Sequence, residues 1–246
     1  MSEKRVWLGL LPPDDPTKAE GLVTAALQSE RLIDITSAPA RWGGLMRGTD
    51  AKLSTFGGQE VENAMDANHA MTLIHAELVQ TLSSIGRDYI DVLFLTVRNE
   101  LKKHQIDGAL KALGSAKSEG AIRQLGLYAE SKDAAGVLQQ GEFDIVMVPN
   151  NPLHPNLWNE LQIDTTGDRP LLASCRTLNW GGGRAFSDDI SLIQSQIATK
   201  AHFGNVLVGV RSAEEVKIAI DAEGAQPDPV VDRLLEEAAK RRSRHS

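Results

Sequence analysis

The chain has 246 residues, a length at which α/β barrels commonly form a single domain. Its 33 aspartates and glutamates outnumber its 26 lysines and arginines, so the net charge of -7 gives no overall attraction to nucleic acid or to an anionic membrane surface. The single cysteine, Cys175, excludes an intramolecular disulfide, and no group of cysteines and histidines has the spacing of a zinc site.

The N-terminal segment predicts a protein that stays in the cytoplasm. Its apolar run ends at Pro12 and Pro13, which makes it too short for the core of a signal peptide or for a membrane span. A lone cysteine also fits a reducing compartment. We therefore expect a cytoplasmic protein without a membrane or nucleic-acid partner, and the sequence leaves its oligomeric state open.

Strand and helix patterns alternate along the first third of the chain. Val6–Leu11 is a predicted strand, and Pro12 and Pro13 end it because proline cannot continue a ladder. Thr17 is expected to cap a helix that runs to about Gln28. Beyond it the pattern predicts a strand at 31–35, a long loop at 36–51, a strand at 52–56 and an amphipathic helix at 66–85.

The stretch Tyr89–Val97 is apolar at nearly every position, which predicts a parallel strand buried on both faces. Further strands are expected at 121–127, 143–148, 169–174 and 205–209, with helices at 105–119, 133–140, 188–202 and 212–222 and a helical turn at 158–161. Eight strands, each followed by a loop or helix, favour a single (β/α)8 TIM barrel over residues 1–222. Residues 223–246 are expected to form a helical extension that packs on the barrel or trails from it.

An open, doubly wound sheet is the alternative architecture. The absence of a G-x-G-x-x-G motif after the first predicted strand disfavours the dinucleotide-binding version of that fold.

Five segments, in the correct order, resemble the aldo-keto reductase superfamily. They are Leu32–Ile35, Leu82–Asp91, Ala112–Gly126, Phe143–Leu153 and Val208–Ser212, and together they cover the predicted strands two, four, five, six and eight. The resemblance implies a TIM barrel and, as its activity, hydride transfer from NADPH to a carbonyl group. That chemistry uses a tyrosine acid, a lysine that tunes it, an aspartate paired to the lysine, and a histidine beside the carbonyl oxygen.

The resemblance carries over only one of these four catalytic residues, the aspartate, which matches Asp34. Trp42, Thr55 and Thr96 stand where the tyrosine, lysine and histidine are implied, and the nearest lysine, Lys52, is displaced by three residues. The implied nicotinamide contacts are also missing, because they fall on Tyr128-Ala129 and Met147. Ordinary NADPH-dependent carbonyl reduction is therefore disfavoured, since losing the proton donor and its activator costs orders of magnitude in rate.

Candidate catalytic residues follow the carboxyl ends of the predicted strands, where barrels keep their active sites. The acid and base candidates are Asp34, Tyr128, Glu130 and His154. The alternative for Asp34 is a strand-end carboxylate that accepts from neighbouring amides, and the alternative for His154 is an ordinary surface residue. Tyr128 and Glu130 are placed just past the fifth strand.

Candidate binding residues surround the same predicted mouth. The substrate-binding candidates are Arg41, Trp42, Thr96, Arg98, Asn150 and Trp180. The cofactor-binding candidates are Gly182 and Arg184 after the seventh strand, and Gly209, Arg211 and Ser212 after the eighth, because barrels often hold a phosphate between these two loops. The glycine run 181–183 is alternatively a flexible loop, and no metal ligands are predicted.

Three hypotheses of function follow from this mouth, which is denser in charge than a nicotinamide pocket requires. The favoured one is an aldo-keto reductase-fold protein repurposed for non-redox acid/base chemistry on, or binding of, a small anionic or phosphorylated metabolite. The second is an NAD(P)H-dependent oxidoreductase with non-standard residues such as Lys52. The third is a non-catalytic pseudoenzyme that binds a ligand or protein. The cofactor is unknown, and NADP(H) rests on the family resemblance alone.

Overall fold

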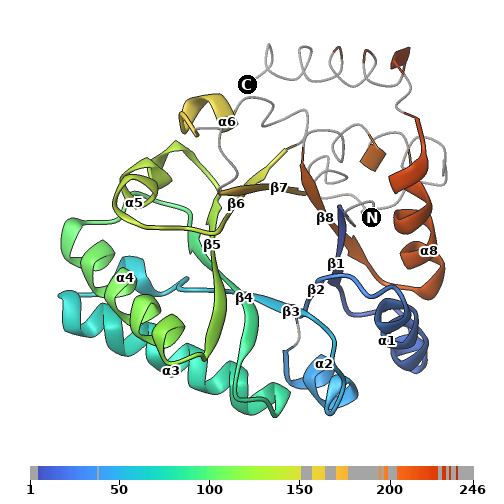
Figure 1. Ribbon diagram of the computed structural model, residues 1–246, viewed down its shortest axis with the longest axis horizontal. Helices are drawn as coiled ribbons and strands as arrows, with labels where there is room; N and C mark the ends of the chain where they lie inside the picture. The colour runs from blue at the N-terminus through green and yellow to red at the C-terminus, as the bar shows by residue number, and fades with distance from the viewer. Residues whose placement is uncertain are drawn as a thin grey trace.

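A computed structural model describes residues 5–37, 39–150, 157–163, 170–176 and 204–226, together with positions 194, 197, 198, 229, 230, 233 and 237. Eight parallel strands form a closed barrel in sequence order, because β1 pairs with both β2 and β8 (Figure 1). This confirms the predicted (β/α)8 barrel. The strands are β1 Val6–Leu10, β2 Ile33–Asp34, β3 Leu53–Gly57, β4 Ile90–Val97, β5 Ile122–Ala129, β6 Ile145–Pro149, β7 Leu171–Cys175 and β8 Asn205–Val210.

The helices lie outside the ring of strands (Figure 1). They are α1 Ala19–Gln28, α2 Pro39–Met46, α3 Ala67–Ile85, α4 Lys103–Ser118, α5 Ala135–Gln140, α6 Leu157–Glu160 and α8 Ala213–Asp221, with short 3-10 turns at Pro16–Lys18, Val61–Asn63, Lys132–Ala134 and Ala222–Gly224. Within the described part of the chain, none of these helices combines the length and apolar character that crossing a membrane requires. The expected helix at 188–202 and most of the expected tail helix lie outside the described residues.

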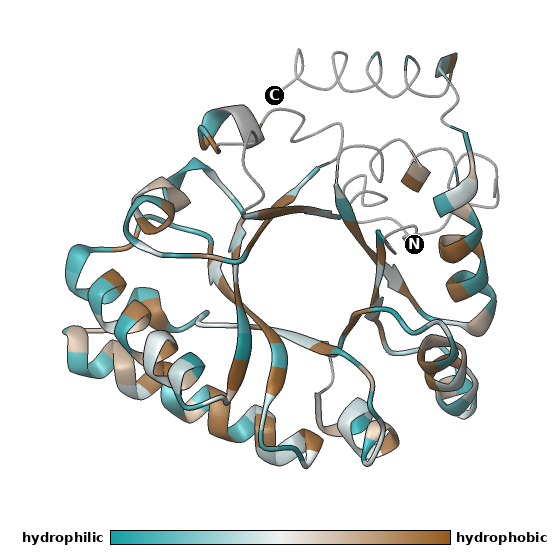
Figure 2. Ribbon diagram, in the orientation of Figure 1, coloured by the Kyte–Doolittle hydropathy of each residue, from teal (hydrophilic) through white to brown (hydrophobic). Residues whose placement is uncertain are grey.

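Alternating side chains of the strands fill two apolar cores, one between barrel and helices and one inside the barrel. In β4, which is buried throughout, Leu93 and Leu95 pack in the outer core while Val92 and Phe94 pack inside the barrel. Apolar positions run along the strands of the ring (Figure 2). Because the strands are parallel, each sends its last inward-facing side chain to the same end of the barrel.

Helix α2 replaces part of the loop that the sequence predicted at 36–51. Two adjacent glycines made a helix there look unfavourable. Gly43 is needed because α2 packs closely on α3: a Cβ atom at this position would lie 2.6 Å from Ile85 Cα and 2.7 Å from the Ser84 carbonyl oxygen. Trp42 and Met46 are fully buried and anchor the helix in the outer core. Tertiary packing therefore outweighs weak local propensity.

The first helix begins differently from the prediction. Asp15, not Thr17, provides the cap, because its carboxylate accepts from the backbone N–H of Thr17 and a 3-10 turn precedes α1. The α3 boundaries match the pattern: Asp66 caps its start and Gly86, at φ 63°, ends it in the left-handed conformation.

An ion pair between Arg31 and Glu223 lies at the amino-terminal face of the barrel. Glu223 accepts from both terminal nitrogens of Arg31, at 3.1 and 2.7 Å, and from the backbone N–H groups of Arg5 and Val6. Burial alone would raise the pKa of Glu223, but the donors from Arg31 and the backbone hold this pKa below its usual value. Glu223, in the turn after α8, thus joins the start of β1 to Arg31, just before β2.

Candidate functional site

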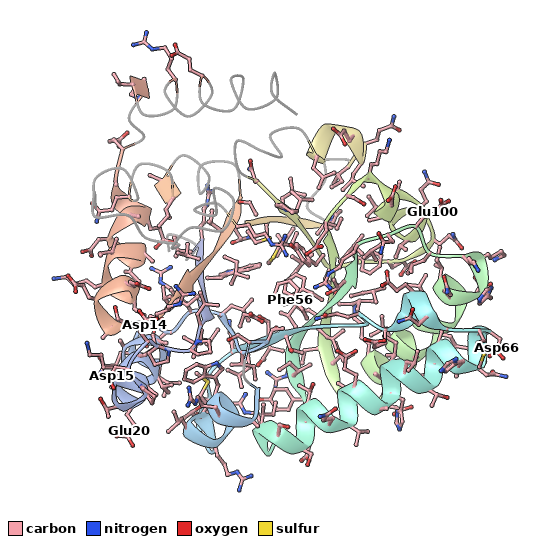
Figure 3. All side chains as sticks on the ribbon, turned by 180° about the vertical axis from the view of Figure 1, so that it is seen from behind. Asp14, Asp15, Glu20, Phe56, Asp66 and Glu100 are labelled. Atoms are coloured by element: carbon pink, nitrogen blue, oxygen red, sulfur yellow. The ribbon has the colours of Figure 1, made fainter. Side chains whose placement is uncertain are left out.

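A cavity of about 410 Å³ opens at the carboxyl ends of the strands, and we call it the mouth cavity. Its floor is built from inward-facing residues near the carboxyl ends of every strand except β6. These residues are Gly9, Asp34, Phe56, Thr96, Tyr128, Cys175 and Gly209. Phe56 lies inside the ring of strands (Figure 3), and its ring meets those of Phe94 and Tyr128 at centroid distances of 5.0 Å. These aromatic rings close the barrel below the cavity.

Asp34, at the end of β2, is a buried carboxyl. The Thr36 hydroxyl donates to Asp34 Oδ1 at 2.7 Å and accepts from the Phe56 backbone N–H at 2.8 Å, so Thr36 is held in place from both sides. No ion pair joins Asp34 to any lysine or arginine of the described chain. Burial raises the pKa of Asp34 to about 7, and the hydrogen bonds from Thr36 only partly offset it.

Thr96 and Tyr128, the hydroxyl pair, are neighbours in the register of β4 and β5. Each is 5% exposed, and neither hydroxyl has a hydrogen-bond partner among the residues that the structure describes. The Tyr128 hydroxyl approaches the Cys175 thiol without the geometry of a regular hydrogen bond. Burial raises the pKa of Tyr128 far above its usual value and that of Cys175 to about 12, so both groups stay protonated. Thr96 and Tyr128 are therefore two buried hydroxyl donors on residues that line the cavity.

Two arginines at the rim share one carboxylate, and we call Arg98 and Arg176 the arginine pair. Arg98 Nε lies 3.3 Å from Glu130 Oε2, and Arg176 Nη2 lies 2.5 Å from Glu130 Oε1. The arginine side chains are 49% and 48% exposed, whereas the Glu130 side chain is only 16% exposed. Arg176 directly follows β7 in the left-handed conformation, at φ 53°, which is strained for a residue with a side chain.

The turn between β8 and α8 is occupied by a carboxylate of the chain itself. Glu215 accepts from the Arg211 backbone N–H at 2.6 Å, and its own N–H donates to the Ser212 hydroxyl that caps α8. Asp14, labelled in Figure 3, and Glu214 add negative charge nearby, and burial is the main cause that raises the pKa of Glu215. A phosphate at this helix start would meet these carboxylates, so the described residues here do not fit the phosphate end of NADP(H).

The structure brings seven of the sequence-predicted residues into the lining of the mouth cavity. They are Asp34, Thr96, Arg98, Tyr128, Glu130, Gly209 and Arg211. Tyr128 and Ala129 belong to β5 itself and not to the loop after it, which is why Tyr128 points into the barrel. His154, Trp180, Gly182 and Arg184 lie outside the described residues.

Other expected positions are corrected by the structure. Trp42 is 0% exposed in the outer core, where its indole N–H donates to the Ser37 hydroxyl at 3.4 Å, so it cannot contact a substrate. Arg41 lines a neighbouring hollow between β3, α2 and α3. Asn150 is buried beside β7, and Ser212 caps α8 without lining the mouth cavity.

Lys52 cannot replace the missing lysine in space. It precedes β3, so it lies at the amino-terminal end of the barrel, where it lines a separate hollow with Glu30, Arg31 and Asp50. The carboxyl end of the same strand faces the mouth cavity, and there Thr55 is buried with its hydroxyl 3.4 Å from that of Thr36.

Sequence reasoning missed Arg176 among the residues of the candidate site. Its position in the sequence could have indicated Arg176, because it follows the carboxyl end of a predicted strand as the other candidates do. No sequence signal could show that its guanidinium group reaches Glu130 across the barrel mouth.

The sequence matches no protein-family model and no curated protein, but its structure matches many solved ones. An aldo-keto reductase from Bacillus halodurans is 17% identical, with a TM-score of 0.68 over 96% of this chain and 91% of its own. A glycerol dehydrogenase from Gluconobacter oxydans is 15% identical, with a TM-score of 0.69 over 96% and 91%. An aldo/keto reductase from Brucella melitensis is 14% identical, with a TM-score of 0.69 over 95% and 92%.

The chain has the aldo-keto reductase fold. The shared fold covers nearly the whole chain, in agreement with the resemblance found in the sequence. At these identities the fold itself is shared, and the chemistry of this aldo-keto reductase-fold protein has to be argued from its own site. Among the described residues, no three histidine, cysteine, aspartate or glutamate side chains gather into a metal-binding group.

Proposed function

We propose that this aldo-keto reductase-fold protein binds a small anionic metabolite in the mouth cavity and catalyses a proton transfer on it without a change in oxidation state. The observation that carries the proposal is Asp34, a buried carboxyl at the cavity floor with a hydroxyl donor and, among the described residues, no ion pair with a cation. Such a group titrates near neutral pH, where a general base is most effective.

The electrostatics of the cavity favour an anion. Among the described residues, three arginines, Arg98, Arg176 and Arg211, line it against two carboxyl groups, Asp34 and Glu130. The ionisable lining therefore carries one net positive charge when Asp34 is ionised and two when it is protonated. Positive charge around a concave, partly desolvated site attracts anionic ligands and holds them more strongly than an exposed surface would.

The chemistry is a proton abstraction next to a carbonyl group. The Asp34 carboxylate takes a proton from the carbon beside the carbonyl, and the C–H electron pair moves toward the carbonyl oxygen to form an enolate. The Tyr128 hydroxyl stays protonated and donates to that oxygen as its negative charge grows. Return of a proton from Asp34 to carbon completes an isomerisation or exchange.

The redox alternative has less support. The resemblance places the proton donor at Trp42, which is buried away from the cavity, and its lysine at Thr55, while Lys52 lies at the opposite end of the barrel. The Glu215 carboxylate also occupies the β8–α8 turn. A pseudoenzyme that only binds its ligand would need the same cavity, so only a measurement of turnover distinguishes it from the proposed enzyme.

The proposal is tested by hydrogen–deuterium exchange at carbon. Proton NMR would follow the C3 signal of 2-oxobutanoate, a small anion with a carbonyl group and exchangeable protons, in D2O with catalytic amounts of protein. We expect exchange that Asp34→Asn reduces by about 100-fold or more, the usual contribution of a general base. Asp107→Asn, which removes a half-exposed carboxylate from α4, serves as the matched control and should exchange normally.

Two results would contradict the proposal. Exchange no faster than the protein-free rate would refute this proton transfer for 2-oxobutanoate and favour a pseudoenzyme. NADPH oxidation coupled to reduction of the same compound would favour the oxidoreductase alternative.

A further inference from the structure

We infer that Glu130 is a displaceable internal ligand, and that the metabolite is a short carboxylic acid with an oxygen on carbon 2, whose carboxylate takes the place of Glu130 between Arg98 and Arg176. The inference deepens the proposed function, because it names the substrate class of the same cavity. It rests on two features of the cavity: the carboxylate shared by two arginines at the rim and the unpartnered hydroxyls at the floor.

The group that bridges the arginine pair indicates what the pair recognises. Glu130 uses one oxygen for Arg176 and the other for Arg98, the arrangement that a free carboxylate would adopt between two guanidinium groups. Both arginines are half-exposed, so these contacts are weak enough to exchange with a dissolved anion. Glu130 directly follows β5, and its side chain has to turn away from the arginine pair when another carboxylate takes its place.

The position of Arg176 places such a carboxylate near the hydroxyl pair. Arg176 Cζ is 5.8 Å from the centre of the Tyr128 ring, and its charge acts on both Tyr128 and Cys175. A carboxylate held there leaves the adjacent carbon beside the two buried hydroxyls. An oxygen on that carbon would accept from Thr96 and Tyr128, which have no other partner among the described residues.

Buried donors without partners are rare in folded proteins, because each costs free energy while it is unsatisfied. Two such donors in adjacent strands, both lining one cavity, therefore indicate an acceptor that arrives with the ligand. The hydroxyl pair selects for the oxygen on carbon 2, and the arginine pair selects for the carboxylate. Short 2-oxo and 2-hydroxy acids carry both groups on neighbouring atoms.

The test compares two acids that differ only in this oxygen, 2-oxobutanoate and butanoate, by isothermal titration calorimetry. Removing the internal competitor in Glu130→Ala should tighten both acids by about threefold to tenfold, and Glu130→Gln should do the same. Glu62→Gln is the matched control, because this carboxylate lies in the small hollow beside Arg98 but bonds to Asn99 and not to the arginine pair. It should change both affinities by less than about twofold.

The oxygen subsite is tested with Tyr128→Phe and Thr96→Val, which remove one hydroxyl each. Each should weaken 2-oxobutanoate by about threefold to tenfold, the value of one hydrogen bond, and leave butanoate unchanged. The inference would be overturned if both Glu130 variants bound the acids more weakly, or if their effect were no larger than that of Glu62→Gln. It would also be overturned if Tyr128→Phe and Thr96→Val weakened 2-oxobutanoate and butanoate equally. The absence of binding of 2-oxobutanoate to the wild type at about 10 mM would overturn it as well.

The outcomes separate this inference from the proposed function. If the affinities follow this pattern but no deuterium exchange occurs, the acid-binding site stands and the role of Asp34 as a base fails. If exchange depends on Asp34 but Glu130→Ala weakens binding, the proton transfer stands and the displacement of Glu130 is wrong.

Discussion

Replacing Asp34 by asparagine should make the protein more stable at alkaline pH. The pKa of this carboxyl rises from 3.8 to about 7 in the folded state because of burial. Between these two values the folded protein holds a proton that the unfolded chain has lost, so the free energy of unfolding falls as pH rises through this range and levels off above about 7. The ionised carboxylate destabilises the fold, and asparagine cannot ionise.

The size of the effect follows from the same values. Each pH unit is worth about 1.4 kcal/mol, so the rise of about three units costs the wild type roughly 4 kcal/mol once both states are ionised. Between about pH 5 and pH 8 the wild type should therefore lose roughly 3 kcal/mol relative to Asp34→Asn. Because other groups titrate in both proteins, the difference between the two isolates Asp34.

Urea unfolding at several pH values in this range, followed by circular dichroism, measures both free energies. At about pH 5 the two proteins should differ by roughly 1.6 kcal/mol, because the unfolded chain already loses the Asp34 proton above pH 3.8, and by about 1 kcal/mol more for the altered hydrogen bond with Thr36. A stability difference that stays constant from pH 5 to pH 8 would refute the reasoning, because it would mean that Asp34 ionises in the folded state as it does in the unfolded chain.

Three further stability changes can be measured in the same way. Gly43→Ala should cost about 2 kcal/mol, because its Cβ would collide with the α3 backbone, whereas Gly44→Ala, with nothing within 4 Å, should stabilise α2 by up to about 1 kcal/mol; equal effects would contradict this packing. Tyr128→Phe should raise the free energy of unfolding without ligand by about 1 kcal/mol, because it removes an unpartnered buried hydroxyl; a loss would mean that the hydroxyl has a partner. Glu223→Ala should lower the free energy of unfolding by roughly 2–4 kcal/mol, because it leaves the Arg31 charge buried and unpaired; an unchanged midpoint of urea unfolding would show that the ion pair does not stabilise the fold.

The barrel could be predicted from the sequence because its strands are buried on both faces. Such strands appear as continuous apolar runs, and Tyr89–Val97 becomes β4 with only its first residue outside the strand. Helix α2 could not be predicted, because it depends on the contact between Gly43 and α3. That contact joins residues about 40 positions apart and leaves no local pattern.

The site could be predicted in part, because a parallel barrel brings the carboxyl ends of its strands together. That rule placed Asp34, Thr96 and Glu130 correctly at one mouth. It could not distinguish an inward from an outward side chain at a loop position, and so it placed Trp42 at the mouth although this residue lies in the outer core. The partners of Glu130 are set by side-chain reach across the mouth, which depends on coordinates and not on sequence order.

Proton uptake on binding tests most directly whether one cavity combines a titrating carboxyl with an acid-binding site. Calorimetric titration of 2-oxobutanoate at about pH 8, repeated in buffers of different ionisation enthalpy, measures the number of protons taken up. Asp34 is mostly ionised at this pH, and a carboxylate bound nearby should raise its pKa further. We predict uptake of a fraction of a proton in the wild type, because Asp34 has to stay mostly ionised to act as a base, and almost none in Asp34→Asn; binding without proton uptake, or equal uptake in both proteins, would contradict the account.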